Sequence, residues 1–130
     1  MMHVSSLVLK VLLSGYLLGV LIETPVLFFG LSRRYSFGER IFAGLWLTAC
    51  TYPIVILVIP YWVNPQTNTL LYILIAETFA PLAECALFWV LFGKRDLLGQ
   101  LSMWRDFGAI TLANVLSFAA GELLRVVWRF

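Results

Sequence analysis

The chain has 130 residues, of which 62% are apolar and 12% are charged, and its mean hydropathy is +0.93. This apolar content is far above that of a soluble domain, and a net charge of +2 is too small to indicate nucleic-acid binding. We therefore predict an all-α polytopic membrane protein with a single transmembrane domain over residues 1–130, the lipid bilayer as its surroundings and no nucleic-acid partner.

Four segments are long enough to cross a membrane, because about 20 apolar residues span a hydrocarbon core of roughly 30 Å. The spans are predicted at about 11–31, 41–63, 70–92 and 107–128. We expect the first to be retained rather than cleaved as a leader, since its apolar run continues through Glu23 and Pro25 without a typical cleavage site. Connections this short favour a four-helix transmembrane bundle of two antiparallel hairpins.

Basic residues indicate the orientation of the spans. Loops 32–40 and 93–106 hold six of the nine Lys and Arg residues, namely Arg33, Arg34, Arg40, Lys94, Arg95 and Arg105. The positive-inside rule then makes both loops cytoplasmic and leaves both termini outside, in the inner or cell membrane of a bacterium or archaeon. The acidic residues of these loops, Glu39, Asp96 and Asp106, are expected to be solvated.

Four glutamates lie inside the predicted spans, where an ionised carboxylate costs at least roughly 2.5 kcal/mol and needs a proton, a partner or a cation. At 1.5 Å per helical residue, Glu23, Glu84 and Asn114 share a layer roughly 10 to 12 Å below the cytoplasmic face. Glu77 and Glu122 form a second layer near the outer face. Glu122 precedes Arg125 by three residues, so a local ion pair is expected there.

The two hairpins show a weak internal similarity. The stretch from Glu23 to Gly30 is similar to that from Glu84 to Gly93, and a basic loop and a similar helix start follow each one. A true repeat would relate the hairpins by a pseudo-twofold axis along the membrane normal and would place Glu23 and Glu84 at equivalent depths. Chance similarity between apolar segments is the alternative.

Oxygen-bearing side chains accompany these glutamates. The second span offers Thr48, Thr51 and Tyr52, followed by Pro53, which frees a backbone carbonyl. The candidate ion- or substrate-binding residues are Glu23, Glu84, Asn114, Glu77, Thr51, Tyr52 and Ser117. Oxygen ligands suit a hard cation, whose identity stays unknown, and without it the carboxylates would hold protons. An organic cation would fit equally, and no other cofactor is expected.

Three functions fit this pattern. The first is a cation- or proton-linked transporter or channel component. The second is a non-catalytic accessory or assembly subunit, whose glutamates hydrogen-bond neighbouring helices at about 0.6 kcal/mol a pair. The third is an intramembrane enzyme acting on a lipid, with Ser117 as nucleophile and Glu84 as base, although no His or Lys supports that pair.

Partners and other chemistries follow from the same residues. Four helices enclose little interior space, so a homo-oligomer or a larger membrane complex is expected. The only histidine is His3, outside the spans, which leaves haem and zinc sites without ligands. Cys50 and Cys85 are expected to be buried small hydrophobes.

Overall fold

The computed structural model describes residues 2–93 and 100–128, with side chains for residues 5–93 and 103–128. Every regular element among them is helical: α1 (Met2–Gly30), α2 (Phe37–Pro53), the π-helical η1 (Ile54–Val58), α3 (Ile59–Trp62), α4 (Thr69–Phe92) and α5 (Gln100–Val127). Four stretches are long and apolar enough to cross a membrane: Ser5–Gly30, Phe37–Trp62, Thr69–Phe92 and Met103–Val127. The expectation of an all-α chain with four such helices is confirmed.

Three of the long helices begin several residues earlier than the apolar pattern suggests. Helix α1 starts at Met2 rather than near residue 11, α2 starts at Phe37 rather than at residue 41, and α5 starts at Gln100 rather than at residue 107. In α1 the added residues contain neither Gly nor Pro, so nothing in them stops the helix. Lys94, Arg95 and Asp96 of the predicted loop 93–106, together with Arg129 and the side chain of His3, lie outside the described residues.

The start of α2 is fixed by a capping box. The Glu39 backbone N–H donates to Ser36 Oγ at 3.2 Å, and the Ser36 N–H donates to Glu39 Oε2 at 2.9 Å. Two backbone donors that the helix itself leaves open are thereby satisfied. Glu39 therefore has a local structural role at the exposed start of α2, in addition to the solvation expected of it.

A π-helical segment interrupts the second apolar helix. The Ile59 N–H donates to the Ile54 carbonyl, one residue further back than in an α-helix, and Pro60 has no N–H to offer to Val55. The Tyr72 hydroxyl of α4 donates to the freed Val55 carbonyl at 3.0 Å. The sequence had directed attention to the carbonyl freed by Pro53, which lies inside α2, whereas the freed carbonyl that the Tyr72 side chain reaches is that of Val55.

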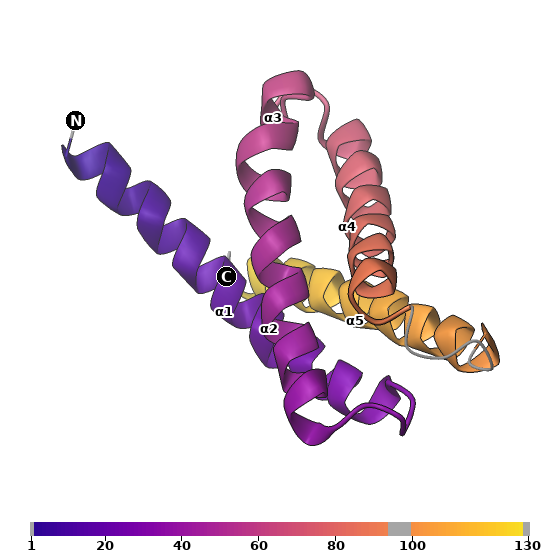
Figure 1. Cartoon of the computed structure of the whole chain (residues 1–130). Helices are drawn as coiled ribbons and strands as arrows, with labels where there is room; N and C mark the ends of the chain where they lie inside the picture. The colour runs from indigo at the N-terminus through magenta and orange to yellow at the C-terminus, as the bar shows by residue number, and fades with distance from the viewer. Residues whose placement is uncertain (1, 94–99, 129–130) are drawn as a thin grey trace.

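The helices contact one another in a ring, in which α1 packs against α2 and α5, and α4 packs against α5 and α2 (Figure 1). Small residues allow the close approaches. A Cβ built on Gly44 would lie 2.8 Å from the Cα of Thr24, and one built on Gly15 would overlap the Tyr52 side chain. The N-terminal part of α1 extends away from the other helices (Figure 1). Leu7, Leu9 and Leu13 of this part are exposed.

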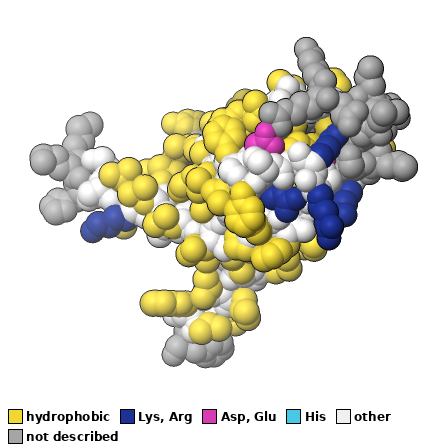
Figure 2. Space-filling view, turned by 60° about the horizontal axis from the view of Figure 1, so that its bottom comes forward, with side chains coloured by type: hydrophobic (Ala, Val, Ile, Leu, Met, Phe, Trp, Pro, Cys, Tyr) yellow, Lys and Arg dark blue, Asp and Glu magenta, His cyan; other side chains and the backbone are white. Residues whose placement is uncertain are grey.

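The hydrophobic core gathers toward the end of the molecule that holds the α1–α2 connection. Its members are Leu27, Leu31, Tyr35, Ala43, Leu47, Phe88, Phe92, Met103, Ala109, Ile110 and Ala113. The Tyr35 ring packs edge-on to Phe88 and Phe92, with centroids 5.3 and 5.1 Å away. Elsewhere large hydrophobic side chains cover much of the surface, and basic side chains gather at the connection end (Figure 2).

Asp106 ties the α1–α2 connection to α5, and the expectation that it is solvated is wrong. Its carboxylate is 0% exposed and accepts from the Ser32 N–H at 2.7 Å, from Ser32 Oγ at 3.2 Å and from Arg34 Nη2 at 3.3 Å. Because α5 already begins at Gln100, Asp106 lies inside a helix that packs against α1. A buried charge needs such partners.

Two further arginines serve the C-terminal end of α1. Arg40 donates to the carbonyls of Phe28, Ser32 and Tyr35 at 2.7, 3.2 and 3.1 Å, and Arg105 Nε donates to the Gly30 carbonyl at 3.2 Å. Cations are favoured at this end of a helix, where carbonyls lack intrahelical partners. The basic residues used to infer orientation therefore also hold this end of the fold together.

Candidate functional site

Glu23 of α1 is buried between α2 and α5, with 5% of its surface exposed. Thr48 Oγ1 of α2 donates to Glu23 Oε2 at 2.7 Å, and Ser117 Oγ of α5 donates to Glu23 Oε1 at 2.7 Å. Both carboxyl oxygens thus have a hydroxyl partner, each from a different helix. Sequence reasoning had considered Ser117 as a partner of Glu84, and the structure pairs it with Glu23 instead.

Glu84 of α4 is 2% exposed and makes the corresponding contacts. Thr51 Oγ1 of α2 donates to Glu84 Oε1 at 2.7 Å, and Asn114 Nδ2 of α5 donates to Glu84 Oε2 at 2.7 Å. Depth counting had put Glu23, Glu84 and Asn114 in one layer, and the structure joins two of them directly. The layer consists of two carboxyl groups, each bridging α2 and α5.

The two sets of contacts have the same pattern. The Thr48–Glu23 hydrogen bond corresponds to the Asn114–Glu84 hydrogen bond when α1 is exchanged with α4 and α2 with α5. By the same exchange, the Ser117–Glu23 bond corresponds to the Thr51–Glu84 bond. The donors on α2 are three residues apart, as are those on α5, so each pair lies on one helix face. A pseudo-twofold repeat of hairpins would also pair the contacts in this way, and the repeat itself stays a prediction.

Thr48 is the residue that the candidate set lacked. Its hydroxyl had been noted with Thr51 and Tyr52, but only the latter two were carried into the set. Its position one helical turn before Thr51 is the signal that could have identified it. Residues three positions apart lie on the same face of a helix, so a face that places Thr51 beside a carboxylate also carries Thr48.

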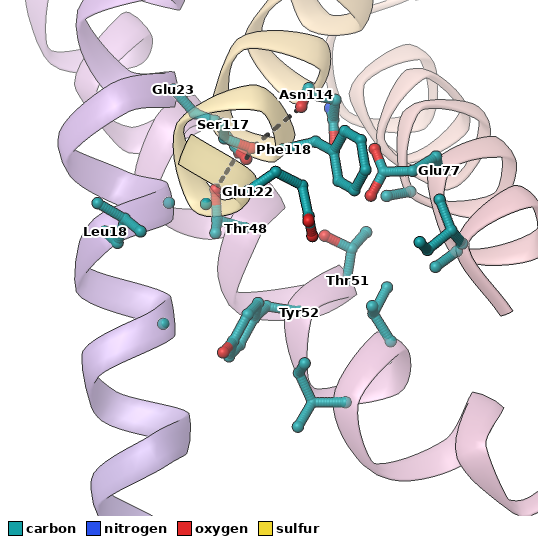
Figure 3. Close-up of a pocket in the computed structure, with 18 of the residues that line it drawn as sticks. Leu18, Glu23, Thr48, Thr51, Tyr52, Glu77, Asn114, Ser117, Phe118 and Glu122 are labelled. Carbon is teal, nitrogen blue, oxygen red and sulfur yellow. Dashed lines mark hydrogen bonds between the residues drawn. The ribbon is translucent and has the colours of Figure 1, made fainter. Parts of the chain in front are cut away.

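A cavity of about 510 Å³ lies beside this layer. Glu23, Glu84, Thr51, Asn114 and Ser117 line it at the layer, and the following residues extend its walls toward the C-terminal end of α5: Tyr52, Tyr72, Glu77, Phe118, Glu122 and Arg125. Figure 3 shows Glu23, Thr48 and Ser117 close together, with Glu77 across from them. All seven candidate residues therefore line one space.

The outer part of the cavity holds the other two glutamates. Arg125 Nη2 lies 3.4 Å from Glu122 Oε1, which confirms the expected ion pair, and the two side chains are 58% and 37% exposed. No hydrogen bond joins Glu77 to another residue that the structure describes. Arg125 is the only cationic side chain among the cavity's described lining residues, so Glu23, Glu77 and Glu84 face the space without a basic partner.

The cysteines take no part in this site. Cys50 and Cys85 are free thiols that are partly exposed at the protein surface, and they lie inside the apolar helices α2 and α4. Cys85 Sγ lies 3.8 Å from the Phe107 carbonyl, outside the cavity lining. Among the described residues, no group of three or more His, Cys, Asp or Glu side chains is placed to hold a metal ion.

The geometry supports binding of positive charge more readily than bond-breaking chemistry. Carboxylates held by hydroxyl and amide donors can bind a proton or face a cation. Ser117 is the candidate nucleophile, and the carboxylate beside it, Glu23, is itself bonded by a second donor, Thr48. Comparisons of this chain with protein families, with curated proteins and with solved structures gave no match.

Proposed function

We propose that this chain is an integral membrane protein that binds a cation in the acidic cavity and acts as a component of a cation- or proton-linked transporter or channel. The observation that carries the proposal is the cavity of about 510 Å³ that three carboxyl groups line without a basic partner. An ionised carboxylate without a partner is costly in a poorly hydrated space, so a bound proton or a nearby cation would stabilise each of these groups.

The surface supports insertion into a bilayer. Large apolar side chains are exposed along all four long helices, and the aromatic residues Tyr61, Trp62 and Trp128 are exposed near helix ends, where membrane interfaces place them. Basic side chains gather at the α1–α2 connection (Figure 2). We propose two antiparallel hairpins with this basic end in the cytoplasm and both termini outside.

The size of the cavity bears on the kind of cation. Pockets for small molecules occupy about 300–1,000 Å³, a range that includes this one. A dehydrated metal ion would need several oxygen ligands converging at about 2.0–2.6 Å, and no group of three acidic side chains does so among the described residues. A proton, together with a hydrated or organic cation, suits this space better than a chelated metal ion does.

A second candidate is a non-catalytic accessory subunit. This function is favoured because each of the four carboxyl oxygens of Glu23 and Glu84 accepts a hydrogen bond from a neighbouring helix. Such bonds are typical of polar contacts that hold membrane helices together. In that case the cavity would receive a polar side chain of another subunit, in a homo-oligomer or a larger complex. Purification with a stoichiometric partner chain would favour this second function.

Thermal unfolding of the purified protein tests cation binding. Tetramethylammonium and choline are compared with Na⁺ and Mg²⁺, since a ligand at 100 times its Kd stabilises the folded state by about 2.7 kcal/mol. We expect an organic cation to raise the melting temperature of the wild type and of Glu39→Gln, but not of Glu84→Gln. The Glu39→Gln change is the matched control, because glutamine also completes a capping box.

Flux assays in liposomes test the transport step. If none of the four cations raises the melting temperature, and Glu84→Gln conducts cations or protons as the wild type does, cation-linked function at this cavity is refuted. Binding without flux in a homogeneous preparation would instead point to the accessory function. The two measurements therefore separate a binding site from a pathway.

A further inference from the structure

Four arginines with described side chains lie at the end of the molecule that holds the α1–α2 connection, and they differ in what they bind. Arg40 donates to three backbone carbonyls, and Arg34 Nη2 contacts the buried carboxylate of Asp106. Arg33 is exposed, and no hydrogen bond or ion pair joins it to another residue that the structure describes. Arg105, also exposed, bonds to the described residues only through Nε, which donates to a backbone carbonyl. Two guanidinium groups therefore hold the fold together, and two can bind a ligand.

Hydrogen bonds beside them bring Arg33 and Arg105 to one corner of the fold. The residues on either side of Arg33 both bond to the carboxylate of Asp106, which directly follows Arg105. The Arg105 side chain itself reaches the carbonyl of Gly30, three residues before Arg33. We call the surface formed by Arg33 and Arg105, where α5 meets the α1–α2 connection, the basic corner.

The acidic side chains described at this end do not neutralise the basic corner. The Asp106 carboxylate is 0% exposed and accepts its three hydrogen bonds from Ser32 and Arg34. Glu39 accepts from the Ser36 N–H in the capping box. No ion pair joins either carboxylate to one of the two exposed arginines. Positive charge therefore remains at the surface of this end, where Figure 2 shows basic side chains gathered.

Exposed aromatic side chains adjoin the basic corner. Trp104 directly precedes Arg105 and is 71% exposed, and Phe29 directly precedes Gly30 and is 78% exposed. Aromatic side chains of this kind are favoured where a protein meets lipid headgroups. A partner that suits both features needs an anionic group for the arginines and apolar chains for the aromatic rings. An anionic phospholipid has both, whereas a free phosphate ion has only the first.

We infer that the basic corner binds the headgroup phosphate of an anionic phospholipid, with the acyl chains of that lipid beside Phe29 and Trp104. Guanidinium groups bind phosphate through paired N–H donors, and Arg105 keeps both Nη atoms for this purpose because its Nε holds the Gly30 carbonyl. The inference goes beyond the proposed cation site. It rests on the proposed insertion into a membrane and not on cation binding.

Titration of the purified protein with phosphatidylglycerol in micelles of a neutral detergent tests the inference, with bound lipid counted by native mass spectrometry. We expect Arg33→Gln and Arg105→Gln each to raise the Kd for this lipid about fivefold, the equivalent of about 1 kcal/mol for a basic residue at an anionic headgroup. The double variant should raise it about 25-fold, because such contributions add when they are independent. An unchanged Kd in the double variant would overturn the inference.

Lys10→Gln is the matched control, because Lys10 is also exposed but lies 20 residues before Gly30 on α1, roughly 30 Å away. This variant should bind phosphatidylglycerol as the wild type does. Arg33→Gln should also keep the melting temperature of the lipid-free protein, since its side chain has no described partner. Weaker lipid binding by Arg33→Gln then cannot result from unfolding.

Two further ligands test what the basic corner recognises. Phosphatidylcholine has the same phosphate but no net charge, and it should bind more weakly than phosphatidylglycerol. Inorganic phosphate should not displace phosphatidylglycerol, because it has no acyl chains. Equal binding of the two lipids, or displacement by inorganic phosphate, would refute an anionic phospholipid as the ligand. Neither arginine lines the cavity and no cation ligand is added, so this failure is distinct from failure of cation binding.

Discussion

Removing the Asp106 carboxylate is expected to destabilise the fold strongly. In Asp106→Ala the Ser32 N–H loses its 2.7 Å acceptor inside the protein, and a buried unsatisfied donor costs about 1–3 kcal/mol. Arg34, whose side chain is only 21% exposed, also loses its ion pair. Breaking a buried pair costs about 3–5 kcal/mol in all, and we expect a value at the lower end because water still reaches Arg34.

The assay is reversible unfolding in mixed detergent micelles. Glu122→Ala is the control, because it breaks an ion pair between half-exposed and exposed side chains, which is worth about 0–1 kcal/mol. Asp106→Asn should fall between the two, since it keeps an acceptor for Ser32 but loses the charge. If Asp106→Ala costs no more than Glu122→Ala, the buried hydrogen bonds do not hold α5 to the α1–α2 connection.

Three further predictions concern the packing of the helices and the basic end. Gly44→Ala should lower the free energy of unfolding by about 1–3 kcal/mol in the same assay, because the new Cβ would lie 2.8 Å from the Cα of Thr24 and only a separation of α1 from α2 would remove that clash. Gly38→Ala is the control and should be nearly neutral, because there is open space around Gly38. Tyr72→Phe should lower the free energy of unfolding by about 0.5–1.5 kcal/mol and speed amide hydrogen exchange in η1, because it removes the hydrogen bond to the Val55 carbonyl. Unchanged exchange would show that this hydrogen bond does not stabilise η1. Burial and the nearby Asp106 carboxylate raise the pKa of Tyr35 to about 12. In the unfolded chain the pKa of a tyrosine is about 10, so the unfolded state releases this proton first and stability falls as the pH rises from about 10 to 12. Over that range the melting temperature of Tyr35→Phe should fall less than that of the wild type.

Counting residues along helices predicted much about the carboxylate layer. Helical rise alone put Glu23, Glu84 and Asn114 at one depth, and the structure has Asn114 bonded to Glu84. Which hydroxyl meets which glutamate depends on the rotation of each helix about its axis, and that rotation is set by close contacts such as Gly44 against Thr24. A single sequence without those contacts cannot distinguish Ser117 beside Glu84 from Ser117 beside Glu23.

Charged residues near the helix ends were harder to interpret. Asp106 follows Arg105 and precedes an apolar run, which is the composition of a solvated loop end. Its burial arises because α5 starts at Gln100 and turns Asp106 toward a backbone N–H of the α1–α2 connection, a partner more than 70 residues away. Long-range partners of this kind leave no periodic signal in the sequence. The outline of the cavity likewise depends on tertiary packing.

The hydrophobic core begins one helical turn beyond the two buried glutamates. Leu27 and Phe88 are each buried and lie four residues after Glu23 and Glu84, one helical turn beyond them toward the basic end, and Leu31 and Phe92 follow one turn later. Arg125, whose side chain is 58% exposed, lines the cavity, whereas none of these four core residues does. If the proposed transport function is correct, a cation that moved from the glutamates toward the basic end would have to cross the core to which Leu27 and Phe88 belong. The Asp106 hydrogen bonds at that end would then oppose this passage as well as stabilise the fold.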